Sequence, residues 1–373
     1  MEQDRGSSHE LPATGTGRAS QGSLAAGVTD EPVRIDPRFA PEHAAYYLGG
    51  LMEHTGVRQL PWSREGFPQR YSDNKPLAMT LHRAGSERNI YIAADDMPDL
   101  DEAALDWADV YGKVNLVRDL VPSRHAQKVV AIGPSHAVRI WGVAAALHVA
   151  RQTSRAGGRL VTAHEHFRRF WLQATRRVDA SYYEPAPAED DYIFYNSWLW
   201  AKHDEANPPR AEFMRACRAL SPTVRFEGGF IKRRRNDVTA YDDVIAARSY
   251  DLREYLANIK RSTVVFNNPA AHHCLGWKLA EFLRLGKAIV SLPLSRELPA
   301  PLVHGEHLHI VEPDAEAMQD AVRTIVADRD YRHQLERAAR SYYLKHLTPV
   351  RVIERLSDLA FGEQRQQRCS RPT

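Results

Sequence analysis

Short apolar segments alternate with amphipathic stretches over most of the chain. The segments NIYIAA (89–94), KVVAI (128–132), YIFYNSWL (192–199) and STVVF (262–266) are rich in Ile, Val, Tyr and Phe, which is typical of buried strands. Further strands are expected at 223–226, 288–291 and 308–311, and helices at 140–152, 209–219, 250–260, 276–285, 315–328 and 331–347. The alternation predicts an α/β fold with parallel sheets.

A linker rich in proline and acidic residues, PAPAEDD, divides this pattern into two blocks. We therefore expect two Rossmann-like, doubly wound domains that face one another across a cleft, over residues 33–185 and 186–348. Residues 1–32 are rich in Gly, Ser, Ala and Thr, and are expected to form a disordered tail. Residues 349–364 predict a final amphipathic helix. A ligand is expected at the carboxyl ends of the strands, near the cleft.

Composition narrows the class of protein. The 373 residues are 43% hydrophobic and 26% charged, and 50 basic residues against 47 acidic ones give a net charge of +3. This balance argues against a nucleic-acid coat protein. Three scattered cysteines fit neither a disulfide framework nor a zinc cluster, and no apolar segment has the length of a membrane span. We expect a cytoplasmic protein without stable membrane insertion.

Residues 262–297 carry the strongest chemical signal. A strand ends at Phe266, a polar loop follows, and Gly276 then opens a helix. A helix N-terminus attracts anions through its free N–H groups, and Gly276 permits close approach of a ligand to the backbone. Lys278 lies in the first turn, where the helix dipole disfavours a cation unless an anion is bound. Lys278 and Glu281 share one helix face, so a solvated ion pair is the alternative interpretation.

The string GWKLAEFLRLGKAIVS (276–291) resembles a segment of GT-B-type glycosyltransferases that reads Gly-x-Lys-x-x-Glu-x-Leu-x-x-Gly-Lys-x-Val-Val. The resemblance covers about residues 192–360. It implies a metal-independent enzyme that transfers a sugar from a nucleotide-sugar donor to a hydroxyl acceptor, which is a glycan, a lipid-linked molecule or a small molecule. The C-terminal domain would hold the donor and the N-terminal domain the acceptor. The final helix would cross back to the N-terminal domain. No cofactor is implied, since the nucleotide-sugar is a substrate.

The same resemblance assigns donor contacts. It implies that Glu281 binds the ribose and that Gly276 and Lys278 contact the phosphates, with Asn268 in the preceding loop. Many retaining members carry a second glutamate eight positions earlier, where this chain has His273, so His273 is expected to contact the sugar or the diphosphate instead. Trp277 completes the predicted set, with simple packing as its alternative role.

A second basic segment, FEGGFIKRRR (226–235), joins two glycines to four cations. It predicts a phosphate-binding loop that would bring Lys232 and Arg233 to the donor. A patch for nucleic acid or anionic membrane, or a solvated turn, are the alternatives.

Acceptor chemistry is expected after the N-terminal strands. Asp95 and Asp96 directly follow NIYIAA, and a carboxylate there would deprotonate an acceptor hydroxyl in an inverting transfer. A turn or capping role is the alternative. His136, shortly after KVVAI, is the other candidate base. No metal site is predicted. A GT-B-type sugar-nucleotide epimerase and a non-catalytic nucleotide-sugar-binding protein remain as alternative functions.

Overall fold

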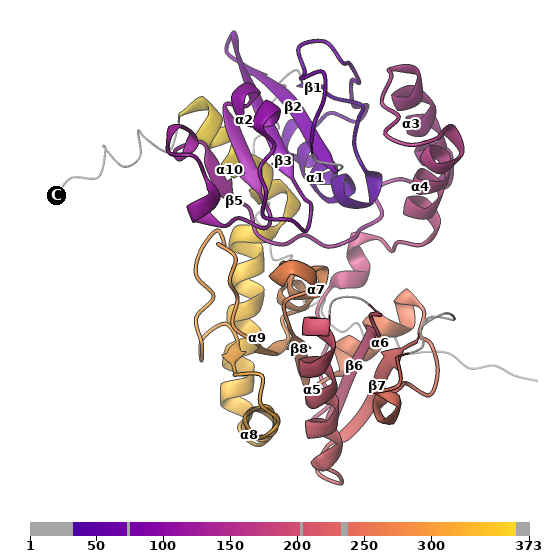
Figure 1. The fold of residues 1–373 in the computed structure, drawn as a ribbon, viewed down its shortest axis with the longest axis vertical. Helices are drawn as coiled ribbons and strands as arrows, with labels where there is room; N and C mark the ends of the chain where they lie inside the picture. The colour runs from indigo at the N-terminus through magenta and orange to yellow at the C-terminus, as the bar shows by residue number, and fades with distance from the viewer. Residues whose placement is uncertain (1–32, 73–74, 202–203, 233–237, 363–373) are drawn as a thin grey trace, which may run out of the picture.

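The computed structural model describes residues 33–72, 75–201, 204–232 and 238–362, which form two α/β domains stacked one above the other (Figure 1). The predicted terminal tail, residues 1–32, lies outside the described residues. The helices are α1 (Pro41–Thr55), α2 (Glu102–Trp107), α3 (Val143–Arg155), α4 (Ala163–Thr175), α5 (Asn207–Ala219), α6 (Leu252–Arg261), α7 (Trp277–Leu285), α8 (Ala315–Ala327), α9 (Arg329–Tyr342) and α10 (Pro349–Phe361).

The N-terminal domain is built on five strands in the order β1-β2-β3-β4-β5. Strands β3, β4 and β5 are parallel, as predicted, whereas β1, β2 and β3 pair antiparallel. The sequence analysis missed the β2–β3 hairpin, whose turn places Ala84 and Gly85 at φ of 48° and 78°. Two residues with positive φ are what a two-residue hairpin turn requires. The bounds are β1 (Val33–Ile35), β2 (Pro76–Arg83), β3 (Ser86–Ala93), β4 (Val110–Lys113) and β5 (Val129–Ala131).

The C-terminal strands are β6 (Tyr192–Trp198), β7 (Arg225–Ile231), β8 (Val264–Asn267), β9 (Ala288–Ser291) and β10 (His309–Ile310). Strands β6 and β7 form one parallel pair, and β8, β9 and β10 form a second parallel set. The N–H of Thr263 donates to the carbonyl of Tyr192 at 2.7 Å, which joins the two sets at β6 and β8. The strands therefore run in the order β7-β6-β8-β9-β10, with the chain reversing direction across the sheet between β6 and β8.

Helices cover both faces of this second sheet, which explains its continuous apolar strands. Val264 and Phe266 belong to the core that α5 and α8 cover, and Val265 to the core beneath α6 and α7. The predicted class, two α/β domains with a doubly wound sheet, is confirmed. The chain enters the second core by Val178 and Tyr183, ahead of the linker at 185–191.

One expectation for β7 was wrong. The segment FEGGFI is strand and not a phosphate-binding loop, because β7 continues to Ile231. A Cβ on Gly228 would lie 2.1 Å from the carbonyl oxygen of Tyr195, and Gly228 has a φ of 112°. The glycine is thus required by strand pairing.

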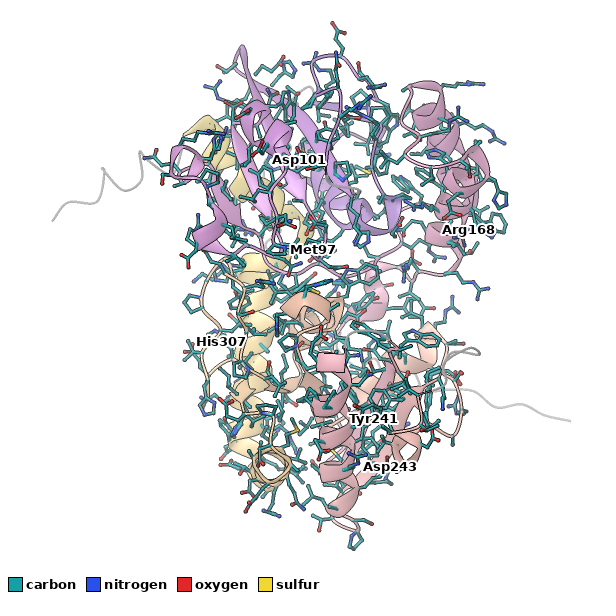
Figure 2. The ribbon with its side chains drawn as sticks, viewed as in Figure 1. Met97, Asp101, Arg168, Tyr241, Asp243 and His307 are labelled. Carbon is teal, nitrogen blue, oxygen red and sulfur yellow. The ribbon has the colours of Figure 1, made fainter. Side chains whose placement is uncertain are left out.

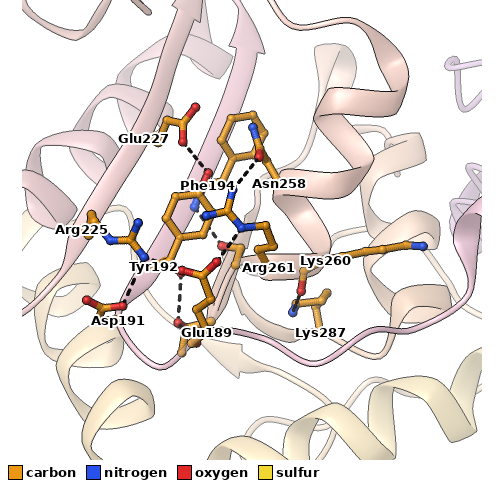
Figure 3. A network of polar contacts seen from close by, with 12 residues as sticks. Glu189, Asp191, Tyr192, Phe194, Arg225, Glu227, Asn258, Lys260, Arg261 and Lys287 are labelled. Atoms are coloured by element: carbon orange, nitrogen blue, oxygen red, sulfur yellow. Dashed lines mark hydrogen bonds and ion pairs between the residues drawn. The ribbon is translucent and has the colours of Figure 1, made fainter.

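The linker is fixed to the sheet at the ends of the strands where β6 begins (Figure 3). Arg261 donates to the carboxylate of Glu189 at 2.5 Å, Arg225 pairs with the same carboxylate, and the Thr263 hydroxyl donates to the carbonyl of Tyr192 at 3.0 Å. Tyr192 also donates to Glu227 at 2.7 Å. These contacts lie where β6 starts, whereas the carboxyl ends of the strands face the other domain.

Helix α10 leaves the second domain and packs against α1, β3 and β4 of the first (Figure 1). Val352, Ile353 and Leu356 are buried in the N-terminal core. A Cβ on Gly50 of α1 would lie 2.3 Å from the backbone of Pro349, so glycine permits the close approach of these two segments. Burial of each large apolar side chain stabilises the folded state by about 1.5–3 kcal/mol.

Candidate active site between the two domains

A cavity of about 660 Å³ lies where the carboxyl ends of the C-terminal strands face the N-terminal domain. Asn196 and Ser197 at the end of β6 line it, as do Asn267 and Asn268 at the end of β8. These are the two strands between which the chain reverses direction, and ligands of open α/β sheets bind at such a point.

Arg210 of α5 lines the cavity and is only 5% exposed. Its Nε donates to Oδ1 of Asn268 at 3.0 Å, and its guanidinium lies 4.6 Å from the centre of the Trp200 ring. Among the described residues, its Nη1 has no hydrogen-bond partner. A buried cation with an unsatisfied donor is unfavourable unless a ligand supplies an acceptor.

Lys278 presents a second cation to the same cavity. Its Nζ donates to the carbonyl oxygen of Asn196 at 2.5 Å and lies 4.5 Å from the centre of the Tyr195 ring. Burial, reinforced by the charge of Arg210, lowers the pKa of Lys278 to about 7. The pKa of this lysine falls so far because no carboxylate among the described residues forms a salt bridge with it.

The N-terminus of α7 faces the same space. Gly276 is its N-cap residue and provides no side-chain hydrogen bond, so the first N–H groups of α7 lack a side-chain cap. Gly276 and Trp277 both line the cavity. The cavity thus combines two cations with a helix N-terminus, and each of these features favours an anion.

Glu281 is not among the residues that line the cavity. It is buried one turn further along α7, where Tyr255 donates to Oε2 at 3.3 Å and Tyr183 donates to Oε1 at 3.5 Å. Burial raises the pKa of Glu281 to about 7, and the nearby Lys278 opposes that shift. Tyr255 does line the cavity, so it is the hydroxyl that connects this carboxyl to the site.

The N-terminal domain contributes His43, Lys75 and Asp96 to the cavity wall. Because Pro76 pairs with Ala93 across the β2–β3 hairpin, Lys75 and Asp96 meet at one edge of the sheet, with Nζ and Oδ2 3.2 Å apart. Sequence analysis missed His43 and Lys75. The hairpin that places Lys75 forms through long-range pairing, and His43 gains its role only from the opposite domain.

His43 lies on α1, with its ring centre 5.4 Å from that of Trp277 across the domain boundary. Burial and the charge of Lys75 lower the pKa of His43 to about 3, so its imidazole is neutral at neutral pH. Arg177 lies 5.1 Å from the centre of the same Trp277 ring. Trp277 therefore joins the two domains at the cavity.

Two of the predicted bases do not line the cavity. Asp95 forms an ion pair with the fully buried Lys113, with Oδ2 and Nζ 2.7 Å apart. His136 is 1% exposed and lies among tyrosine rings, the nearest being Tyr183 at 4.3 Å, while Arg284 approaches its Nε2 at 3.2 Å. Burial lowers the pKa of His136 to about 3. Of the three predicted bases, only Asp96 is brought to the site.

The predicted donor residues are divided in the same way. Gly276, Trp277, Lys278 and Asn268 line the cavity, whereas His273 is exposed outside it with a φ of 56°. Lys232 follows β7 and pairs with Asp242, with Nζ and Oδ1 3.1 Å apart, and it does not line the cavity. Arg233 lies outside the described residues.

One end of the cavity is aromatic, and sequence analysis did not identify it. Trp198, Trp200 and Tyr250 line this end. The signal was present in YNSWLW, where the two tryptophans directly follow the apolar part of a strand. Aromatic faces accept stacked bases of any sequence.

The structure also answers two general questions. Within the described part of the chain, no helix is both long and apolar enough to cross a membrane. The same residues contain no group of three or more His, Cys, Asp and Glu side chains placed to hold a metal ion.

Fold and site together define a two-domain α/β protein with a cation-lined cavity at the point where its second sheet reverses direction. Neither a protein-family model nor a curated protein matches the sequence. Among solved structures, the chain is similar to Anabaena HepE in complex with UDP, with a TM-score of 0.44 and 9% identity over 69% of this chain and 66% of that one.

Two further solved structures are similar. The C-terminal domain of a group 1 glycosyl transferase family protein, LpcC from Francisella tularensis, aligns with 45% of this chain and 97% of its own length, at a TM-score of 0.36 and 12% identity. Sucrose-phosphate synthase from Thermosynechococcus elongatus aligns with 74% of this chain and 65% of its own length, at a TM-score of 0.39 and 16% identity. At these identities and TM-scores, function has to be argued from the site itself.

Proposed function

We propose that this protein is a GT-B-type glycosyltransferase that binds a nucleotide-sugar in the interdomain cavity and transfers the sugar to a hydroxyl acceptor. The observation that carries the proposal is the pair Arg210 and Lys278, two cations that line one cavity and form no salt bridge among the described residues. A diphosphate supplies the acceptor oxygens and negative charge that both groups lack.

The two ends of the cavity fit the other parts of such a ligand. The aromatic end, with Trp198, Trp200 and Tyr250, suits the flat face of a nucleobase. The cavity volume of about 660 Å³ is within the usual range for small-molecule sites, roughly 300–1,000 Å³. Tyr255, which hydrogen-bonds Glu281, lies on the wall where the resemblance placed the ribose.

The chemical step follows from this arrangement. The acceptor oxygen attacks the anomeric carbon, the bond from that carbon to the diphosphate oxygen breaks, and the acceptor proton passes to a base. Asp96 is the proposed base, since its carboxylate lies on the cavity wall beside Lys75. Arg210, Lys278 and the N-terminus of α7 would stabilise the charge that develops on the departing diphosphate.

Titration calorimetry with UDP, GDP, ADP and dTDP tests the donor site. We expect at least one of them to bind, and Arg210→Ala to weaken it at least tenfold, because a hydrogen bond to a charged group contributes about 1.5–3 kcal/mol. Arg215→Ala is the matched control on the same helix, because Arg215 pairs with Asp243 away from the cavity. Absence of binding by all four nucleotides, or unchanged binding by Arg210→Ala, would overturn the proposal.

A second assay separates transfer from the alternative functions. Nucleotide-sugars incubated without an acceptor should be hydrolysed slowly by a transferase and leave the sugar unaltered. An epimerase would change the sugar, and a binding protein would release no nucleoside diphosphate. Asp96→Asn should reduce the hydrolysis rate without changing nucleotide affinity, with Asp99→Asn as the neighbouring control.

A further inference from the structure

Helices α3 and α4 form an antiparallel hairpin at the edge of the N-terminal domain (Figure 1). Their inner faces pack together: Ala150 and Thr153 of α3 are buried, as are His166 and Phe170 of α4, and His166 Nε2 lies 3.0 Å from the carbonyl oxygen of Ala150. The opposite faces of both helices are exposed to solvent.

This hairpin concentrates positive charge. Residues 142–178 contain seven arginines, no lysine and one acidic residue, Glu165, which gives the segment a net charge of +6 in a chain of net charge +3. Glu165 is engaged by Arg168, with Oε2 and Nε 2.6 Å apart, and by Arg169. Among the described residues, Arg151, Arg155 and Arg176 are exposed and form no ion pair. The rest of the chain carries a net charge of −3, so the basic character belongs to this surface.

The same surface exposes large apolar side chains. Trp171 is 48% exposed, and Val143 and Leu160 are each 39% exposed. At helical spacing, Trp171 lies on the same outer face of α4 as Arg168, which Figure 2 shows at the outer edge of the domain. Arg151 and Arg155 share the outer face of α3. An exposed tryptophan among arginines is the pattern of a helix that lies at a membrane interface.

We propose that the outer face of the α3–α4 hairpin binds an anionic phospholipid bilayer. Arginines would pair with the headgroups while Trp171, Val143 and Leu160 enter the boundary between headgroups and acyl chains. A nucleic acid would also satisfy the arginines. However, it would leave the aliphatic side chains exposed, so the bilayer accounts for both sets of residues.

The position of the hairpin relative to the cavity adds a consequence that rests on the proposed function. Helix α4 ends at Thr175, and Arg177 just beyond it lies over Trp277 of the cavity wall at 5.1 Å. A membrane bound at the hairpin would therefore lie beside the site. Among the three predicted classes of acceptor, this favours a lipid-linked hydroxyl.

Sedimentation with vesicles tests the proposal on the full chain. Vesicles of phosphatidylcholine alone are compared with vesicles in which part of it is replaced by phosphatidylglycerol. We expect binding to the anionic vesicles only, reduced by salt. The double variant Arg151→Glu/Arg155→Glu should bind them at least tenfold more weakly, and Trp171→Ala should also lose affinity. Arg323→Glu/Arg337→Glu is the matched control, two exposed arginines of α8 and α9 in the other domain, and should bind like the wild type.

The outcomes that would overturn the proposal are distinct. They are absence of binding to anionic vesicles, equal loss in the control, or wild-type binding by the hairpin variants. Replacement of Arg233, Arg234 and Arg235 by serine tests the other basic segment, and loss of vesicle binding in that variant alone would also overturn it. If the hairpin variants lose duplex DNA binding but keep vesicle binding, the surface binds nucleic acid instead. Nucleotide titration of each variant checks the cavity separately, so a failure of the proposed donor site is distinguishable.

Discussion

Arg210 donates a hydrogen bond from Nε to Oδ1 of Asn268 at 3.0 Å, and this contact joins helix α5 to the loop after strand β8. Tyr195 donates to the same oxygen at 3.4 Å. The amide therefore orients the guanidinium without neutralising it, because an amide oxygen carries no full charge. The positive charge of Arg210 remains available to a ligand in the cavity.

This relationship predicts the effect of Asn268→Asp. A carboxylate at this position would form an ion pair with Arg210 and compete with an anionic ligand. We expect nucleoside diphosphate affinity to fall at least tenfold while the thermal midpoint of the free protein rises, because a buried cation gains a partner. Calorimetry and thermal unfolding measure the two quantities. Asn268→Ala, the control, should lower the midpoint, and a higher affinity in Asn268→Asp would contradict the role given to Arg210.

Nucleotide affinity should depend on pH through Lys278. Its pKa is about 7 in the free protein, and a bound diphosphate would raise it. Affinity should be greatest below pH 7 and should fall as the pH rises above 7, because the lysine must then take up a proton on binding. Lys278→Arg is the control, since arginine stays charged throughout this range. Calorimetry from pH 6 to pH 9 should show the decline in the wild type and a flatter profile in Lys278→Arg; parallel profiles would exclude the lysine as its source.

Glu281 should make the free protein less stable at higher pH. Its pKa is raised in the folded state from 4.5 to about 7, so the folded protein holds a proton that the unfolded chain releases. The stability from this group is fully present below pH 4.5 and is lost as the pH rises through 7. Glu281→Gln keeps a hydrogen-bond acceptor for Tyr255 and removes the titration. Its thermal midpoint relative to the wild type should rise between pH 5 and pH 8, whereas a constant difference would argue against a buried protonated carboxyl.

Helix α10 should stabilise the N-terminal domain. Leu356→Ala removes a fully buried side chain and should lower the free energy of unfolding by about 2–5 kcal/mol. Arg351→Ala on the same helix is exposed and should cost less than about 1 kcal/mol. Chemical denaturation measures both variants. Equal effects would show that the inner face of α10 contributes no more than its surface.

The sequence by itself determined the α/β class, most of the strands and helices of the second domain, and four residues of the cavity. Periodicity and capping are local, so Ala288–Ser291 and Trp277–Leu285 lie where the pattern placed them, to within one residue. Gly276, Lys278 and Asn268 were found because the helix N-terminus and the preceding loop are adjacent in sequence.

Only the tertiary structure decided which charged groups meet. Arg210, more than 50 residues before Asn268, reaches the cavity because β6 and β8 are neighbours in the sheet. Lys75 reaches Asp96 because β2 and β3 form a hairpin. Likewise, His136 follows a strand as Asp96 does, but the packing of Tyr183 and Arg284 buries it. Burial and partnership depend on contacts between distant segments, and the order of residues along the chain does not specify them.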